Sequence, residues 1–160
     1  MKEESSDSIR FQTLDEARLI ARRLAALTPT PDMVEIGLVE LLINAIEHGN
    51  LDIDYEEKRR LMLEETFYEE IAYRMSTPPW SLRSARITTA RKKHAIVFLV
   101  EDEGEGFDWN SVDMRYPRRI TDPNGRGIAM ARMLSFQQLE YLGRGNQVRA
   151  TVFISADQHC

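Results

Sequence analysis

From Val34 to Asn50 the chain reads V-E-I-G-L-V-E-L-L-I-N-A-I-E-H-G-N. Apolar residues take most positions of this run, which predicts a helix that is largely buried. Glu40 and Asn44 are four residues apart, so on a helix they share one face, and His48 lies a further turn along. Polar groups inside a core need hydrogen-bond partners. The run therefore predicts a central helix that carries one polar stripe.

Two interpretations of this polar stripe are open from these residues alone. A Glu and an Asn at this spacing are commonly solvated or bonded to each other, but they can also form part of a reactive site. His48 is interpreted as a residue that caps the helix or bonds a neighbour, since most histidines in such positions do so.

The composition describes one soluble globular domain. The chain has 160 residues, 42% of them hydrophobic and 29% charged, which is enough for one sizeable core. A net charge of -5 offers no basic surface for nucleic acid, and no apolar run is long enough to span a membrane. The only cysteine is Cys160, so no disulfide can form within the chain. We expect a cytoplasmic protein without nucleic-acid or membrane partners.

Local signals divide the rest of the chain. We expect a disordered leader over residues 1–7, one domain over 8–155 and a tail over 156–160. Thr13 and Glu16 fit a capping box that opens a helix with a core-facing stripe reaching Leu27, and Thr30 with Pro31 opens the central helix, which stops at Gly49. The remaining predicted elements are a strand over 8–12, a helix over 54–75, strands over 84–89 and 95–101, a helix over 128–134, and a hairpin of 136–142 with 147–155.

The predicted helix over residues 54–75 belongs to a helical insertion that spans about residues 54–84. Asp54 can cap its start, and its apolar residues recur at helical spacing. That apolar row consists of Leu63, Phe67, Ile71 and Met75. The insertion is interpreted either as a packed surface helix or as a surface for docking a partner.

Two glycine-rich segments carry the candidate chemistry. Residues 102–108 read D-E-G-E-G-F-D, so Asp102 leaves a strand end just before two glycines that let a ligand approach the backbone. Residues 124–127 read N-G-R-G directly before a predicted helix, whose N-terminal amides suit phosphate. Alone, each segment is equally typical of an ordinary turn. Neither matches a Rossmann fingerprint or a P-loop.

Taken in order, the E-x-x-x-N helix, the D-x-G-x-G segment and the later G-x-G segment resemble the GHKL (Bergerat-fold) ATPases. The resemblance covers residues 8–155 and implies an α+β two-layer sandwich, with a mixed sheet covered by helices on one face. It also implies that the domain binds ATP and Mg²⁺. The polar stretch over about 108–125 corresponds to the ATP lid, and a loop of that length is usually functional or mobile.

The resemblance assigns a role to each matching residue. Asn44 corresponds to the Mg²⁺ ligand that also contacts nucleotide, Glu40 to the general base, and Asp102 to the acceptor of the adenine amino group. The other cofactor-binding positions that it implies are Gly104 and Gly106 beside adenine, Gly125, Arg126 and Gly127 near phosphate, and Thr151 reaching adenine through water. A single amide oxygen suffices for Mg²⁺ when phosphate and water complete the shell.

Within that superfamily, E-L-L-I-N-A-I-E-H-G-N is similar to the anti-sigma-factor serine kinases of bacterial partner switching. The sequence looks most like the kinase-like domain fused to receiver and PPM-type phosphatase domains. This implies phosphorylation of a serine on a STAS-type anti-sigma-factor antagonist, and binding of a sigma factor. The insertion over 54–84 is a departure from the compact kinases. A histidine kinase ATPase domain and a non-catalytic binding module stay open as alternatives.

Overall fold

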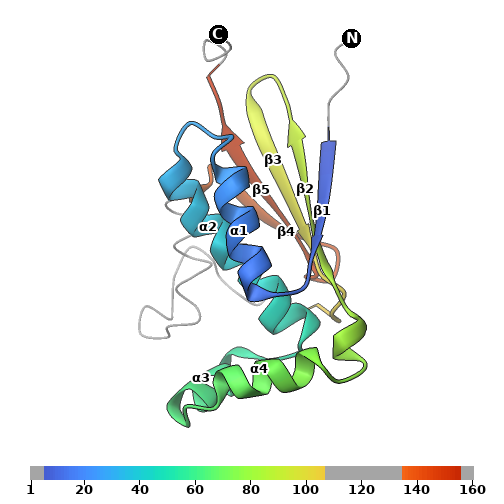
Figure 1. Cartoon of the computed structure of the whole chain (residues 1–160). Coiled ribbons are helices and arrows are strands. Elements are labelled where there is room, and N and C mark those ends of the chain that lie inside the picture. The colour runs from blue at the N-terminus through green and yellow to red at the C-terminus, as the bar shows by residue number, and fades with distance from the viewer. Residues whose placement is uncertain (1–5, 107–134, 156–160) are drawn as a thin grey trace.

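The computed structural model describes residues 6–106 and 135–155 and has an α+β architecture of two layers (Figure 1). Within these residues five strands form one sheet in the order β1-β2-β3-β5-β4. The elements are β1 (Ser6–Phe11), α1 (Leu14–Ala25), α2 (Pro31–Asn44), the π-helix η1 (Ala45–Asn50), α3 (Tyr55–Leu63), α4 (Phe67–Met75), the 3-10 helix η2 (Trp80–Leu82), β2 (Ala85–Arg91), β3 (Ala95–Glu101), β4 (Gln138–Leu142) and β5 (Gln147–Phe153).

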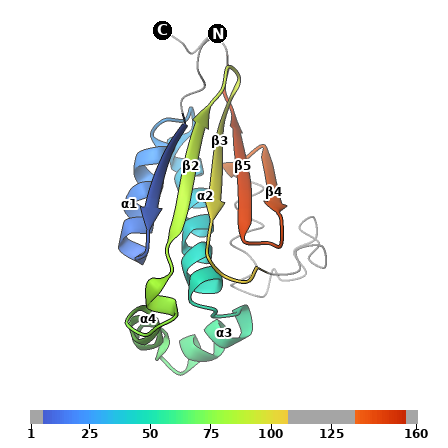
Figure 2. The same cartoon turned by 90° about the vertical axis from the view of Figure 1, so that its right-hand side faces the viewer.

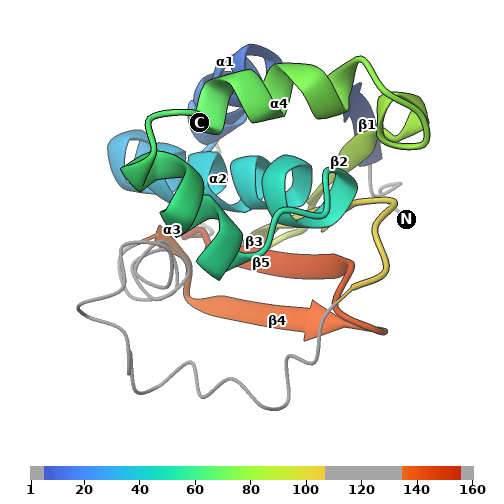
Figure 3. The ribbon, with the colours of Figure 1, turned by 90° about the horizontal axis from the view of Figure 1, so that it is seen from below.

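Helices α1 and α2 cover one face of the sheet, as the resemblance implied (Figures 2 and 3). The expectation of a mixed sheet was wrong in the described residues, because all four strand pairings are antiparallel. Helices α1 to α4, with η1 and η2, lie between β1 and β2, and the chain then returns to the end of the sheet where β1 finished. The strands β2 and β3, and likewise β4 and β5, are joined by short turns, which require antiparallel pairing.

The core lies between the sheet and the two long helices. Along β3, Ile96, Phe98 and Val100 are buried, while the residues between them face away from the helices. Strand β3 is the middle strand of the sheet, as its apolar run predicted. The capping box was also confirmed, because Thr13 Oγ1 accepts from Glu16 N–H at 3.1 Å and Glu16 Oε1 accepts from Thr13 N–H at 3.1 Å.

Several boundaries differ from the prediction. Strand β1 begins at Ser6, so the first strand takes in two residues of the expected leader. Helix α1 ends at Ala25, which leaves Leu27 beyond the helix and half exposed, and its place in the core stripe was wrong. The predicted start at Pro31 was confirmed, but the central helix runs one residue past Gly49, to Asn50.

The insertion holds two helices where one was predicted. Helix α3 ends near Glu65, whose φ of 59° is left-handed and cannot continue a right-handed helix. The chain turns there, and α4 buries Phe67 and Ile71 while Leu63 is 78% exposed. The cap was confirmed, since Asp54 Oδ1 accepts from Glu57 N–H at 2.7 Å. Both helices lie at the end of the sheet where β3 finishes (Figure 1).

The last turns of the central helix form a π-helix. In η1 the backbone bonds reach five residues back, as in the bond of 2.9 Å from Leu51 N–H to the Ile46 carbonyl. A π turn holds more residues than an α turn, so side chains after Asn44 are rotated away from where α-helical spacing would place them. Such turns are frequent at functional sites.

Several predicted features lie outside the described residues. They are the helix over 128–134, the lid over 108–125 with Gly125, and the neighbouring Arg126 and Gly127. Within the described ranges, no helix combines the length and the apolar character that a bilayer span requires.

Gly37 gives a test of the packing between α2 and the chain before β4. A Cβ on Gly37 would lie 2.3 Å from Ser135 Cβ and 2.7 Å from Phe136 Cε2. Gly37→Ala should therefore destabilise the domain by about 1–2 kcal/mol despite the better helix propensity of Ala. Urea unfolding measures this. Ile36→Ala, at an exposed neighbouring position, should change stability by about 0.5 kcal/mol or less.

Candidate functional site

The end of the central helix meets the end of β3 at a glycine. A Cβ on Gly49 would lie 2.3 Å from Asp102 Cγ, so only glycine lets the helix come this close to the carboxylate. Gly104 is equally constrained, because its Cβ would lie 2.3 Å from the Gly49 carbonyl oxygen. The structure therefore brings Asp102 and Gly104 against the helix just beyond Asn44.

Asp102 is a half-buried acceptor with one oxygen unused by the described residues. Its Oδ1 accepts from the Gly104 N–H at 2.8 Å, and its Oδ2 has no hydrogen bond within the described part of the chain. Burial raises the pKa of Asp102 to about 6, against the lowering effects of the Gly104 N–H and the charge of Arg83. A carboxylate with one oxygen already bonded and the other without a bond from the described residues suits a ligand that carries a hydrogen-bond donor.

Backbone contacts fix the loop that follows Asp102. Asn50 Oδ1 accepts from the Glu103 N–H at 2.9 Å, which ties the last residue of η1 to this loop. Gly106 has a φ of 83°, and a Cβ there would lie 2.0 Å from the Arg144 carbonyl oxygen. The D-x-G-x-G pattern thus reflects two close backbone approaches, one at each glycine.

Two groups on the polar stripe of the central helix lack a hydrogen-bond partner among the residues that the structure describes. Asn44 Nδ2 is buried and has no hydrogen-bond partner within the described residues. Glu40, one turn earlier, is half-buried and has no hydrogen bond or ion pair within the same ranges. A buried amide without a partner costs free energy, so Asn44 is a position where a ligand would restore a bond.

Sequence reasoning missed Glu47, the most deeply buried acid of this helix. Its side chain is 1% exposed and pairs with Lys58 Nζ at 2.8 Å. Burial raises the pKa of Glu47, Lys58 opposes the rise, and the charge of Glu40 adds to it. Its position three residues after Asn44 on an apolar helix could have indicated a buried acid. Its partner could not be predicted, because Lys58 lies on α3.

His48 has a structural role, as the sequence indicated. Its Nδ1 bonds the Ile53 carbonyl oxygen, and its ring lies against Tyr55 with centroids 4.1 Å apart. Burial lowers the pKa of His48 to about 4, so the ring is neutral near pH 7 and donates through Nδ1. The imidazole holds the turn that leads from η1 into the insertion.

Thr151 is not where the resemblance placed it. In the β3–β5 register it lies opposite Val97, whereas Asp102 N–H donates to the Asn146 carbonyl oxygen at 3.0 Å. Five residues of strand separate the two positions, or about 17 Å. The adenine contact assigned to Thr151 was therefore wrong, because one strand register fixes which residue meets Asp102. Asn146 occupies that level, and its place after the Gly143–Gly145 turn was the signal for it.

Tyr141 was also missed by the sequence reasoning. It lies on β4 opposite Val148, on the face of the sheet that the helices cover. Burial raises the pKa of Tyr141, and the charges of Tyr55 and Asp102 raise it further, which places all three groups at this end of the sheet. Only the sheet order, which sets β4 beside β5, brings them together.

Comparison with known families identifies the architecture. The family model for the histidine kinase-like ATPase domain matches residues 10–152, which is most of the chain. The chain therefore belongs to the histidine kinase-like ATPase domain family, and it is an ATP-binding domain of the GHKL superfamily. No curated protein matches the chain significantly.

The residues present fit the Mg²⁺ that accompanies ATP in such domains. No group of three or more His, Cys, Asp or Glu side chains within residues 6–106 and 135–155 could hold a metal by itself. Mg²⁺ bound mainly through phosphate and water needs little more than one protein oxygen. Asn44, whose Nδ2 has no hydrogen-bond partner in the described part of the chain, offers that oxygen without adding charge.

The raised pKa of Asp102 predicts a pH-dependent stability. Because the folded-state pKa of about 6 exceeds the ordinary 3.8, the folded state binds the proton more tightly, and this stabilisation is lost as pH rises through about 6. Asp102→Asn has no such loss, so its stability relative to wild type should increase from pH 4 to pH 6 and then level off. Urea unfolding across this range measures the difference. A constant difference would contradict the assignment, and Glu105→Gln, an exposed position, should show no such step.

Proposed function

We propose that this domain is an ATP-dependent protein serine/threonine kinase and anti-sigma-factor-like regulator in a bacterial partner-switching pathway. Its substrate is a serine of a STAS-type anti-sigma-factor antagonist. The observation that carries the proposal is that Glu40 and the Nδ2 of Asn44 have no hydrogen-bond partner among the described residues, one turn apart on the helix that ends against Asp102. One helix thus carries a candidate general base and a candidate metal ligand, and its end contacts the aspartate proposed to bind adenine.

Adenine recognition follows from the state of Asp102. Its Oδ2, which accepts no bond from the described residues, accepts a hydrogen bond from the amino group of adenine. Gly104 and Gly106 place no side chain on that side of the site. Gly125, Arg126 and Gly127 contact the phosphates through their amides and the guanidinium group. The nucleotide therefore spans the space from the end of β3 toward Asn44.

Phosphate transfer uses Glu40. Asn44 would hold Mg²⁺ together with the phosphates, and the ion would neutralise charge on the triphosphate. Glu40 is partly exposed, so the hydroxyl of a protein serine can reach it. The serine oxygen forms a bond to the γ-phosphorus, the bond from γ-phosphorus to the bridging oxygen of ADP breaks, and the hydroxyl proton passes to the Glu40 carboxylate. Glu47 is unsuited to this role because Lys58 and burial hold it away from substrate.

The biological setting rests on the likeness to anti-sigma-factor kinases. The partners are then the antagonist, a sigma factor that is held when the antagonist is phosphorylated, and receiver and PPM-type phosphatase domains fused to or associated with this one. The cytoplasm is the setting in which such partners act. The α3–α4 insertion occupies part of the surface, so the sigma-binding surface of compact kinases is not assumed for this chain.

Nucleotide binding is tested at Asp102. Asp102→Ala removes a charged acceptor worth about 1.5–3 kcal/mol, so the affinity for Mg²⁺-ATP should fall roughly ten- to a hundredfold. Isothermal titration calorimetry on folded protein measures the affinity, with circular dichroism as the check on folding. Equal affinity in a folded variant would remove Asp102 from the site.

Phosphate transfer is tested at Glu40. Glu40→Ala should lower transfer of labelled phosphate to an antagonist serine by roughly 10²–10⁴-fold, because general-base assistance is worth about that much. Nucleotide affinity should hardly change, since adenine is bound elsewhere. Asn44→Ala is the comparison variant and should weaken Mg²⁺-dependent nucleotide affinity as well.

Two results would overturn the kinase proposal. If Glu40→Ala transfers phosphate at nearly the wild-type rate, Glu40 is not the base. If wild-type protein binds ATP but phosphorylates no antagonist, the domain is a non-catalytic binding module. Transfer of the γ-phosphate from ATP to a histidine of a partner, instead of to a serine, would identify the ATPase domain of a histidine kinase.

A further inference from the structure

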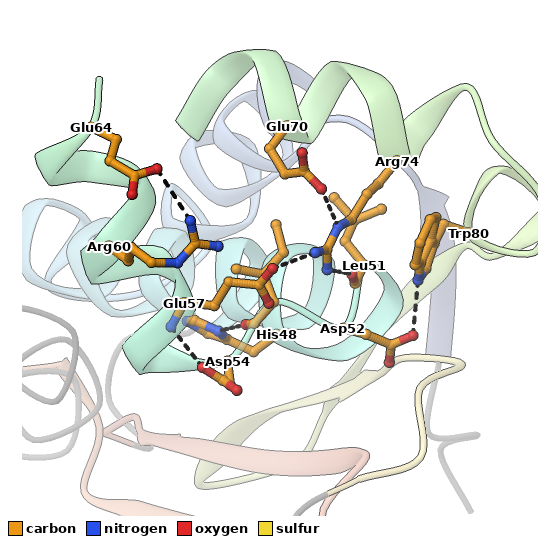
Figure 4. A network of polar contacts seen from close by, with 11 residues as sticks. His48, Leu51, Asp52, Asp54, Glu57, Arg60, Glu64, Glu70, Arg74 and Trp80 are labelled. Carbon is orange, nitrogen blue, oxygen red and sulfur yellow. Dashed lines mark hydrogen bonds and ion pairs between the residues drawn. The ribbon is translucent and has the colours of Figure 1, made fainter. Parts of the chain in front are cut away.

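The α3–α4 insertion is bonded to the end of the helix that carries the site, and Arg74 makes the central link (Figure 4). Arg74 lies on α4 and is 9% exposed. Its Nε donates to Glu70 Oε1 at 2.9 Å, its Nη2 to Glu57 Oε1 at 2.5 Å, and its Nη1 to the Leu51 carbonyl oxygen at 2.8 Å. One guanidinium group thus joins α3, α4 and the residue that follows η1.

The Leu51 carbonyl is a group that needs an external donor. Leu51 caps the C-terminal end of η1, where helix carbonyl groups lack partners within the helix. A positively charged donor at this end is favourable, because the helix dipole leaves partial negative charge there. Arg74 supplies both the hydrogen bond and the charge, and it is buried together with the carbonyl it satisfies.

The next residue is held just as closely by the insertion. Asp52 has a φ of 56°, a left-handed conformation that is unfavourable for most non-glycine residues. Trp80 Nε1 donates to Asp52 Oδ2 at 2.9 Å, and Arg83 donates to the same oxygen at 2.8 Å. The ring of Trp80 also lies 5.0 Å from the Arg74 guanidinium carbon. The turn after η1 is therefore fixed by side chains from α4 and the segment after it.

This turn sits beside the nucleotide-binding residues. Asn50, directly before Leu51, holds the Glu103 N–H, and Gly49 contacts Asp102. A shift of Leu51 would move Asn50 and change the loop that shapes the base-recognition end of the site.

We propose that Arg74 is a positioning residue for the nucleotide site, acting through Leu51 and Asn50 on the Asp102–Gly104 loop without touching nucleotide. The proposal rests on nucleotide binding at Asp102. The insertion then contributes to ATP binding, because it holds the end of the central helix and fixes the last turn of that helix.

The test replaces Arg74 and compares it with a matched arginine of the same insertion. Arg74→Met removes all three hydrogen bonds but keeps an apolar stem, and it should weaken Mg²⁺-ATP affinity by about tenfold or more. Arg60→Met removes a half-exposed pair with Glu64 and should leave the affinity within about twofold. Arg74→Lys keeps the charge and should recover part of the loss. Calorimetry is done at a temperature where circular dichroism shows each variant folded.

A second measurement separates positioning from a general loss of stability. In ¹H–¹⁵N spectra recorded without nucleotide, Arg74→Met should shift the Glu103 and Gly104 amide signals, whereas Arg60→Met should not. If Arg74→Met does not fold, Trp80→Phe keeps an aromatic ring but loses the bond to Asp52, and it should shift the same amides and weaken affinity several-fold.

The outcomes distinguish this inference from the proposed function. Unchanged affinity and unchanged Glu103 and Gly104 signals in a folded Arg74→Met variant would overturn the positioning role. Lower melting temperature with neither change would leave Arg74 a structural residue only, which also overturns it. If wild-type protein binds no Mg²⁺-ATP, nucleotide binding at Asp102 fails, and the amide shifts alone decide whether Arg74 controls the loop.

Discussion

The close approach of Gly49 to Asp102 is the constraint on which the site depends. It requires a helix whose last turn presents a glycine to a strand end, and the π-helix η1 provides that turn. The same approach excludes water from one side of the carboxylate, which is why burial is the main cause of the raised pKa of Asp102. The chemistry of the Asp102 carboxylate thus depends on the geometry of the helix end.

Much of the fold could be predicted because its signals are local. The capping box at Thr13, the Thr30–Pro31 start and the apolar runs of β3 and β5 act through neighbours in sequence, and each formed an element close to its predicted position. The candidate site was predictable for a similar reason. A carboxylate followed by spaced glycines, and an amide one turn from an acid, are short patterns with direct geometric meaning.

The features that could not be predicted depend on contacts distant in sequence. The strand register that removes Thr151 from the site is set by the pairing of β3 with β5, and the partner of Glu47 is supplied by α3. The helix break at Glu65 costs local free energy and is offset by the burial of Phe67. Hydrophobic periodicity cannot reveal a helix break of this kind, because a continuous helix and a broken one bury similar patterns of residues.

The antiparallel sheet also fixes where the described ends of the chain lie relative to Asp102. Ser6 pairs with Ala90 and Phe153 pairs with Ala95, so the first and last described strands begin and finish at the β2–β3 turn. Asp102 lies at the opposite end, beyond the seven residues of β3, which is on the order of 20 Å away. The described ends of the chain therefore lie at the end of the sheet far from Asp102.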